Sequence, residues 1–129
     1  VARNIIVAES DAQAEDWLLD PEGSNYYYFN YLWEVLKRAD YTAVMKPDPD
    51  MADEDVTVES IIKASVIYGS SKTVAERIID LRRRSGPFGT LLMASMDMKG
   101  ANKERELVSM RRLAEEVRPI VNKDELALA

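Results

Sequence analysis

Cysteine and histidine are both absent from this 129-residue chain. Without cysteine the chain has no disulfide framework, no thiol nucleophile and no thiolate metal ligand. Without histidine it lacks the commonest metal ligand in proteins and the usual general base near neutral pH. The composition therefore excludes Ser-His-Asp hydrolysis, zinc hydrolysis and His-Cys redox chemistry within the chain, and we expect no metal site.

An excess of basic residues is absent as well, because 23 acidic residues outnumber 17 basic ones and give a formal net charge of −6. A chain of this sign is a poor partner for nucleic acids and for anionic membrane surfaces. Apolar runs reach only a few residues, far below the ~20 that span a bilayer. No signal-peptide pattern opens the sequence, which favours a cytoplasmic location. The start at Val1 instead of Met leads us to expect a processed or truncated product.

The acidity is concentrated in residues 47–59, which hold six acidic side chains and no basic one. Asp48, Asp50 and Glu59 fall at positions 1, 3 and 12 of an EF-hand calcium loop. Position 6 is Asp53, where that loop needs a glycine for its turn. We therefore favour a solvated, proline-stiffened connector over a calcium site.

Hydrophobic periodicity predicts an α/β chain in which strands alternate with helices. Residues 3–8 and 90–95 are typical of buried strands, and residues 65–68 form a brief extended run before Gly69. Helices are predicted where apolar residues recur at helical spacing and a polar side chain can cap the first turn. They cover residues 11–19, 24–39, 57–64, 70–85 and 102–121.

The last predicted helix contains Pro119, which we expect to weaken or kink its final turns. Helical spacing predicts an inner, core-facing stripe on this helix. The stripe consists of Leu107, Met110, Leu113, Ala114 and Val117.

Two strands with their helices leave both sheet edges open and cannot enclose a catalytic cavity. We therefore interpret residues 1–129 as a single partial domain, a piece of a larger α/β layer structure. Residues 1–9 hold the first strand, and residues 10–68 form a helical excursion that contains the acidic connector 46–57. Residues 70–121 form a helix-strand-helix unit.

Three segments carry a family resemblance: KPDPDMADEDVT (46–57), VIYGSSKTVAERIIDLRRRSGPFGTLLMA (66–94) and the SM…LAEEVRPIV pattern (109–121). The specific element is the combination of Gly-Ser-x-x-x-Val-Ala-Glu with Gly-Pro-Phe-Gly-Thr-Leu-Leu. Together these segments resemble the luciferase-like flavin-dependent monooxygenases, and are most similar to members of the alkanal and limonene monooxygenase type.

The resemblance implies the C-terminal fragment of a TIM (β/α)₈ barrel, formed by the last two βα units and a helical insertion. Residues 3–8 would then be the seventh strand and residues 90–95 the eighth. A complete barrel needs well over twice the length of this chain. The strands that supply most flavin contacts in the family would therefore lie outside it.

The resemblance also implies a function. In the family, reduced FMN activates oxygen, and one oxygen atom is inserted into a small apolar substrate such as an aldehyde, ketone or terpene. This chain would be the carboxyl-terminal part of such an oxidoreductase, inactive in isolation and without bound cofactor. We expect flavin and apolar substrate as partners of the parent enzyme, and a homo-oligomer because exposed strand edges favour self-association. No residue is assigned a catalytic role.

Gly69, Ser70 and Ser71 are the candidate cofactor-binding residues. They open a predicted helix, whose backbone N–H groups and dipole suit an anion such as the flavin phosphate. Helix capping alone explains the same residues and is the favoured interpretation.

Tyr28, Tyr31, Met96 and Asp97 are the candidate substrate-pocket residues. The tyrosines belong to an aromatic-rich helix, although such sets more often form a core or a subunit contact. Met96 and Asp97 follow the last strand. Family members often carry Gly-His/Lys-Asp-Trp where this chain has Ser-Met-Asp-Met (95–98), so only Asp97 matches. The alternative to an enzyme part is a non-enzymatic α/β self-association module.

Overall fold

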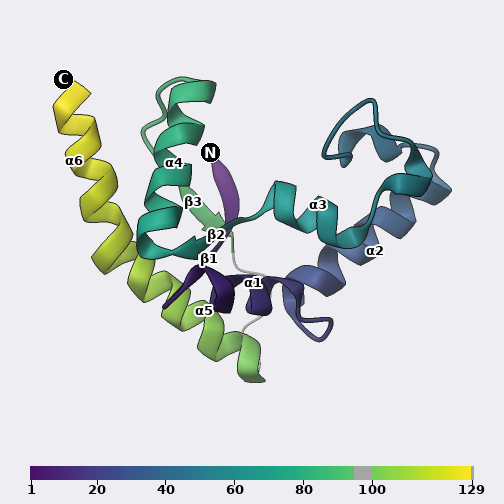
Figure 1. The fold of residues 1–129 in the computed structure, drawn as a ribbon, viewed down its shortest axis with the longest axis horizontal. Helices are drawn as coiled ribbons and strands as arrows, with labels where there is room; N and C mark the ends of the chain where they lie inside the picture. Colours follow the sequence, from purple (N-terminus) through teal and green to yellow (C-terminus); the bar gives the residue numbers. More distant parts are fainter. Residues whose placement is uncertain (95–99, 129) are drawn as a thin grey trace.

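The computed structural model describes the backbone of residues 1–94 and 100–128. It contains a small parallel sheet with helices on both faces (Figure 1). The first half holds β1 (Ala2–Ala8), α1 (Asp11–Leu19), α2 (Ser24–Arg38) and α3 (Val58–Ser65), with short 3₁₀ turns at Thr42–Val44 and Asp53–Asp55. The second half holds β2 (Ile67–Ser70), α4 (Ser71–Ser85), β3 (Leu92–Ala94), α5 (Gly100–Arg112), a π-helical turn (Leu113–Val117) and α6 (Arg118–Leu128).

The predicted helices are confirmed, and polar side chains cap the first turns of two of them. Ser10 caps α1 by accepting a 3.1 Å hydrogen bond from the Gln13 backbone N–H. Thr57 caps α3 in a reciprocal arrangement with Ser60. These caps satisfy N–H groups that have no partner inside the helix, which is why the starts can be read from local sequence.

The brief extended run predicted at residues 65–68 is part of a third strand, β2, which lies at Ile67–Ser70. β2 pairs in parallel with β1 from Ile5–Ile67 to Ala8–Ser70, so it extends past Tyr68. Four residues are too few to show a period of two, and the strand is defined by its pairing with β1. The helical excursion consequently ends before β2 rather than at residue 68.

The strand order is β2-β1-β3, with β1 in the centre. β3 pairs with residues 2–4 of β1, in the register Ala2–Leu92 to Asn4–Ala94. Consecutive strands of a (β/α)₈ barrel are neighbours, whereas here β3 lies on the opposite side of β1 from β2. The α/β class and parallel pairing are confirmed, but this order does not confirm a barrel fragment.

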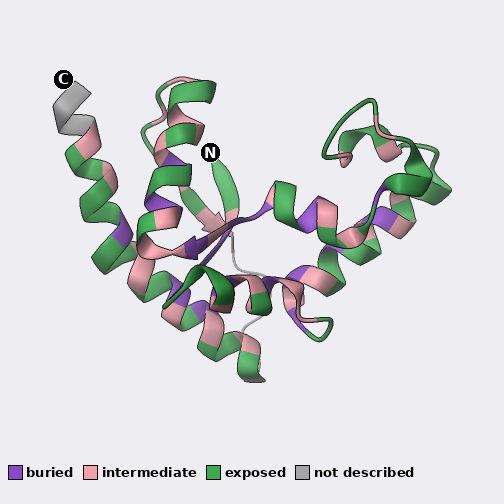
Figure 2. Ribbon diagram, in the orientation of Figure 1, coloured by how far each residue is buried: buried purple, intermediate pink, exposed green. Residues whose placement is uncertain are grey.

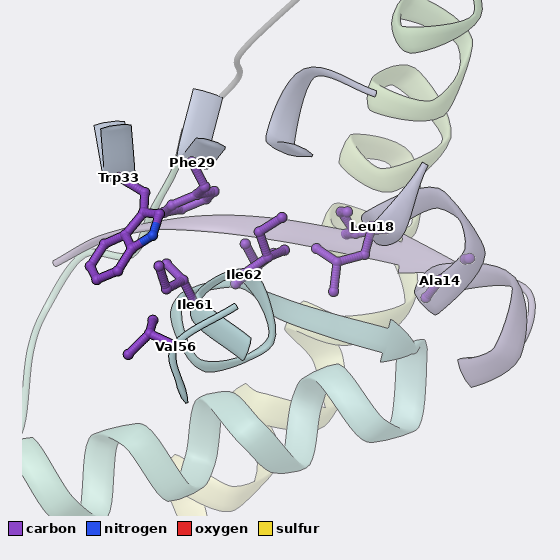
Figure 3. Packing of buried hydrophobic residues seen from close by; sticks show 10 residues of the cluster. Ala14, Leu18, Phe29, Trp33, Val56, Ile61 and Ile62 are labelled. Atoms are coloured by element: carbon purple, nitrogen blue, oxygen red, sulfur yellow. The ribbon is translucent and has the colours of Figure 1, made fainter. Parts of the chain in front are cut away.

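One face of the sheet packs on α1, α2 and α3. Ile6 and Ala8 of β1 contribute to this α1–α3 cluster, in which Trp33 packs with Phe29, Val56, Ile61 and Ile62 (Figure 3). The most deeply buried large side chains there are Leu18, Ile61 and Ile62, each with no exposed area.

The other face packs on α4 and the end of the α5–α6 helix. Ile5 and Val7 point to this side, as the alternation of a strand requires. The α4–α6 cluster also contains Ile67, Val74, Ala75, Ile78 and Val117. Buried positions thus gather where helices meet the strands, while residues 118–124 of α6 are mostly exposed (Figure 2).

The inner stripe predicted for residues 102–121 is wrong in part. Leu107 and Met110 are 40% and 47% exposed, whereas Glu106 and Ser109 are buried. The helix is therefore rotated so that polar side chains face the sheet. It is also continuous through Pro119, directly after a π-helical turn. Proline cannot donate the regular hydrogen bond and its ring crowds the preceding turn, which accounts for the widened backbone there.

Candidate functional site

The carboxyl ends of β1 and β2 lie side by side, because Ala8 pairs with Ser70. The starts of α1 and α4 therefore meet at this edge, which is where α/β proteins place ligands. Asp11 is the first residue of α1, and Ser70 is the N-cap of α4. This edge brings together the Gly69-Ser70-Ser71 segment and carboxylates distant from it in sequence.

The Asp11 carboxylate accepts two hydrogen bonds from the start of α4. Its Oδ1 accepts the Ser70 backbone N–H at 2.7 Å, and its Oδ2 accepts the Thr73 hydroxyl at 3.0 Å. The Ser70 hydroxyl in turn donates to Thr73 Oγ1 at 3.1 Å. The Ser70 N–H, followed by the Thr73 hydroxyl, lowers the pKa of Asp11 below its ordinary value, because both donors favour the charged form.

Gly69 is required by the close approach of Asp11. Its φ of +145° is a conformation that side chains rarely adopt. A Cβ atom at this position would lie 2.8 Å from Asp11 Oδ1 and 2.8 Å from Thr73 Cβ. From the sequence, Gly69 is a candidate for anion binding, with helix capping as the favoured interpretation. In the structure Ser70 caps α4, and the missing side chain at Gly69 makes room for the Asp11 carboxylate.

Ser71 meets a second carboxylate. Its hydroxyl donates to Glu116 Oε2 from the π-helical turn, and Glu116 also accepts from Arg112 at 3.0 and 3.2 Å. The predicted cofactor-binding residues thus do lie together at a helix N-terminus. Their donors face Asp11 and Glu116, however, and carboxylates repel a phosphate. As arranged here, these residues do not fit a flavin phosphate.

The candidate substrate-pocket residues are not gathered into one pocket. Tyr28 is 41% exposed and lines an open hollow of about 470 Å³ together with Asn4, Leu32 and Met45. Tyr31 is 58% exposed and is not among the lining residues. Met96 and Asp97 lie outside the described residues. The buried members of the aromatic helix, Phe29 and Trp33, belong to the α1–α3 cluster.

A small cavity beside β1, with polar side chains in its walls, was not predicted from the sequence. It has room for about one water, at roughly 20 Å³, and is lined by Asn25 of α2 and by Glu106 and Ser109 of α5. Asn4 Nδ2 donates to Asn25 Oδ1 at 3.1 Å. Glu106 and Ser109 are three residues apart and so share one helical face, which is the sequence pattern that could have indicated this cavity. The neighbouring apolar stripe is the more pronounced pattern and predicted a different inner face.

Ser109 is bonded to the central strand. Its hydroxyl accepts the Val7 N–H at 3.1 Å and lies 3.3 Å from the Val7 carbonyl oxygen, to which it donates. Within residues 1–94 and 100–128, no strand pairs with residues 5–8 of β1 on the side away from β2. Ser109 therefore supplies the hydrogen bonds that a neighbouring strand would provide.

The acidic connector uses its carboxylates locally. Asp48 Oδ1 accepts the Asp50 N–H at 3.0 Å, and Asp53 accepts from the Thr42 hydroxyl at 2.9 Å and pairs with Lys46. Glu59 accepts the Tyr26 hydroxyl proton at 3.0 Å. Among the described residues, no group of three or more acidic side chains could hold a metal ion. The three EF-hand-like positions do not converge.

Comparison with known proteins gives a match at the level of structure. No family model and no curated protein sequence matches the chain. A solved structure with TM-score 0.75 and 24% sequence identity covers 94% of this chain and 33% of its own length. It is the oxygenating constituent of 3,6-diketocamphane monooxygenase, a type II Baeyer-Villiger monooxygenase from the CAM plasmid of Pseudomonas putida, in complex with FMN. The chain shares the fold of one third of that flavin monooxygenase.

Proposed function

We propose that this chain is the carboxyl-terminal portion of a luciferase-like, FMN-dependent monooxygenase. The observation that carries the proposal is the fold shared over 94% of the chain with a monooxygenase that binds FMN. The chain spans about a third of the length of that protein. The segments around Gly69 and Gly86, which resemble the same family, support the proposal from the sequence.

In the parent enzyme, bound reduced FMN would supply the oxygen activation, and the substrate would be a small apolar aldehyde, ketone or terpene. This chain would contribute α/β units to the fold of the parent and, by its composition, no histidine or cysteine to the chemistry. Its expected location is the cytoplasm. Among the described residues, no helix is long and apolar enough to cross a membrane.

The chain in isolation is proposed to bind no flavin and to have no activity. Asp11 and Glu116 face the donors of the Gly69–Ser71 segment, so a phosphate would meet negative charge there. The hollow beside Tyr28 is open and lies on the face away from the α4–α6 cluster. Flavin contacts would therefore come from the rest of the parent polypeptide.

The mass of the natural gene product tests the proposal. An antibody raised against the 14.6 kDa chain would be used to isolate the product from its source cells. We expect a polypeptide about three times as long, with FMN released on denaturation and identified by chromatography. A flavin-free product of the same mass as the chain would contradict the proposal.

Self-association is the second candidate function, and an exposed stripe on α2 favours it. Tyr27, Tyr31 and Val35 recur at helical spacing and are 72%, 58% and 42% exposed. Exposed aromatic residues of this kind are frequent at protein interfaces. Light scattering over a range of concentrations should show a dimer that Tyr27→Ser with Tyr31→Ser weakens. A monomer at every concentration would contradict this function.

A further inference from the structure

An apolar groove lies between α4, β3 and the α5–α6 helix. Its walls include Ile78, Leu91, Met93, Met110 and Leu113, and its volume is about 420 Å³. This volume falls within the roughly 300–1,000 Å³ that small-molecule sites occupy. The groove exists because α5 turns its polar stripe toward β1, which leaves Met110 47% exposed and Leu113 half-buried.

The π-helical turn forms one wall of the groove. Three of its five residues, Leu113, Ala114 and Val117, line the cavity. A π-helical turn packs an additional residue into the helix and so changes which side chains share a face. Such turns are frequent at functional sites, which gives a second reason, besides the cavity itself, to expect a ligand here.

Arg118 borders this wall of the groove. Arg118 lines the groove and is exposed, and within the part of the chain that the structure describes it has no ion pair or hydrogen bond. Two nearby arginines are paired instead, Arg83 with Asp124 at 3.0 Å and Arg112 with Glu116 at 3.0 Å. The groove therefore combines an apolar trough with one available guanidinium group.

We propose that this groove binds a small amphiphile, with an unbranched hydrocarbon chain along the trough and a carboxylate head at Arg118. Burial of apolar surface in the groove drives the association. The arginine fixes the orientation and selects a negative head group, since guanidinium and carboxylate form charge-assisted hydrogen bonds. The site is independent of the proposed flavin function.

The test uses the full chain and decanoate below its micelle concentration, with decanol and decylamine as head-group controls. Calorimetry should show decanoate binding more tightly than decanol, and decylamine binding least. Arg118→Gln should weaken the binding of decanoate roughly two- to fivefold, which is the range of a surface charge pair, and leave the affinity for decanol unchanged. Arg111→Gln is the matched control, because Arg111 is exposed on the same helix and does not line the groove.

Methionine methyl NMR locates the ligand. Met93 and Met110 line the groove, whereas Met45 and Met51 pack on the α1–α3 cluster. We expect decanoate to shift the methyl resonances of Met93 and Met110 only. Ala114→Trp, at an exposed position of the groove, should abolish these shifts because the indole ring fills the trough. Absence of binding, or shifts at Met45 and Met51 alone, would overturn the proposal. The proposal would also be overturned if a second copy of the chain occupied the groove in a dimer and decanoate did not dissociate that dimer.

Discussion

At the scale of single residues, the contact between Asp11 and the start of α4 joins two helices that are far apart in the sequence. Ser70 and Thr73 provide the donors, and Gly69 provides the space. A helix N-terminus attracts negative charge, so an internal carboxylate is a stabilising occupant of the position that the sequence offered as a candidate phosphate site. Two predictions follow from the presence of the Asp11 carboxylate at this helix N-terminus.

Gly69→Ala should destabilise the chain by about 1–3 kcal/mol, because the new methyl group meets Asp11 and Thr73 at a φ of +145°. The free energy of unfolding in urea measures this. Gly89→Ala is the matched control, since nothing lies within 4 Å of a Cβ there. Equal effects of the two substitutions would show that the close approach at Gly69 does not exist.

Asp11→Asn should lower stability at neutral pH and have little effect in acid. The folded-state pKa of Asp11 is lowered by its Ser70 and Thr73 donors. Its contribution is therefore fully present above the unfolded-state pKa of about 3.9 and is lost as the pH falls through the lower folded-state value. Urea unfolding from pH 7 to pH 3 measures the difference between the two proteins.

The exposed Asp16 on the same helix offers the control substitution, Asp16→Asn. A difference between wild type and Asp11→Asn that stays constant across this pH range would contradict the assigned hydrogen bonds.

At the scale of secondary-structure elements, the orientation of α5 is set by a hydrogen bond to the sheet and not by its apolar stripe. The stripe of Leu107 and Met110 is the stronger hydrophobic signal, yet Glu106 and Ser109 are buried. Val7 has backbone groups on the open side of β1, and leaving them unsatisfied would be costly. A serine directed at them offsets the loss of apolar burial on α5.

Ser109→Ala should therefore cost about 1–3 kcal/mol, the penalty for leaving a buried polar group without its partner. Urea unfolding gives the value, and faster hydrogen exchange at the Val7 amide should accompany it. Leu107→Ala, on the exposed side of the same helix, should have a smaller effect. Unchanged exchange at Val7 would contradict the role given to Ser109.

At the scale of the whole molecule, β1 connects two clusters on opposite faces of the sheet. Ile6 and Ala8 belong to the α1–α3 cluster, and Ile5 and Val7 to the α4–α6 cluster. Because one strand carries both, loss of either cluster removes the support of the other. The chain should therefore unfold as one cooperative unit.

Ile62→Ala should lower the free energy of unfolding by about 2–5 kcal/mol, since Ile62 is fully buried. Trp33 lies in the α1–α3 cluster and Trp17 packs against it, so tryptophan fluorescence reports on this cluster. Far-UV circular dichroism reports on helices of both faces. The two signals should give the same urea midpoint in wild type and variant. Ile120→Ala, the same substitution at an exposed position of α6, is the control. Separate midpoints would show that the faces unfold independently.

Much of the element order was predictable because it depends on near neighbours in the chain. Ser10 and Thr57 cap helices through residues three positions away, and the parallel α/β class follows from the alternation of strands and helices. Two features depend instead on distant residues. β2 exists through its pairing with β1, and the start of α4 is occupied by Asp11, 59 residues from Ser70.

The amino-acid sequence by itself determined which chemistries the chain lacks, where its helices begin and which layer class it adopts. These properties follow from composition and from interactions within a few residues. Only the tertiary structure decided that β3 pairs with β1 instead of β2, that Ser109 rather than Met110 faces the sheet, and that carboxylates face the donors of the Gly69–Ser71 segment. Each depends on hydrogen-bonding groups brought together from far along the chain, which local patterns do not encode.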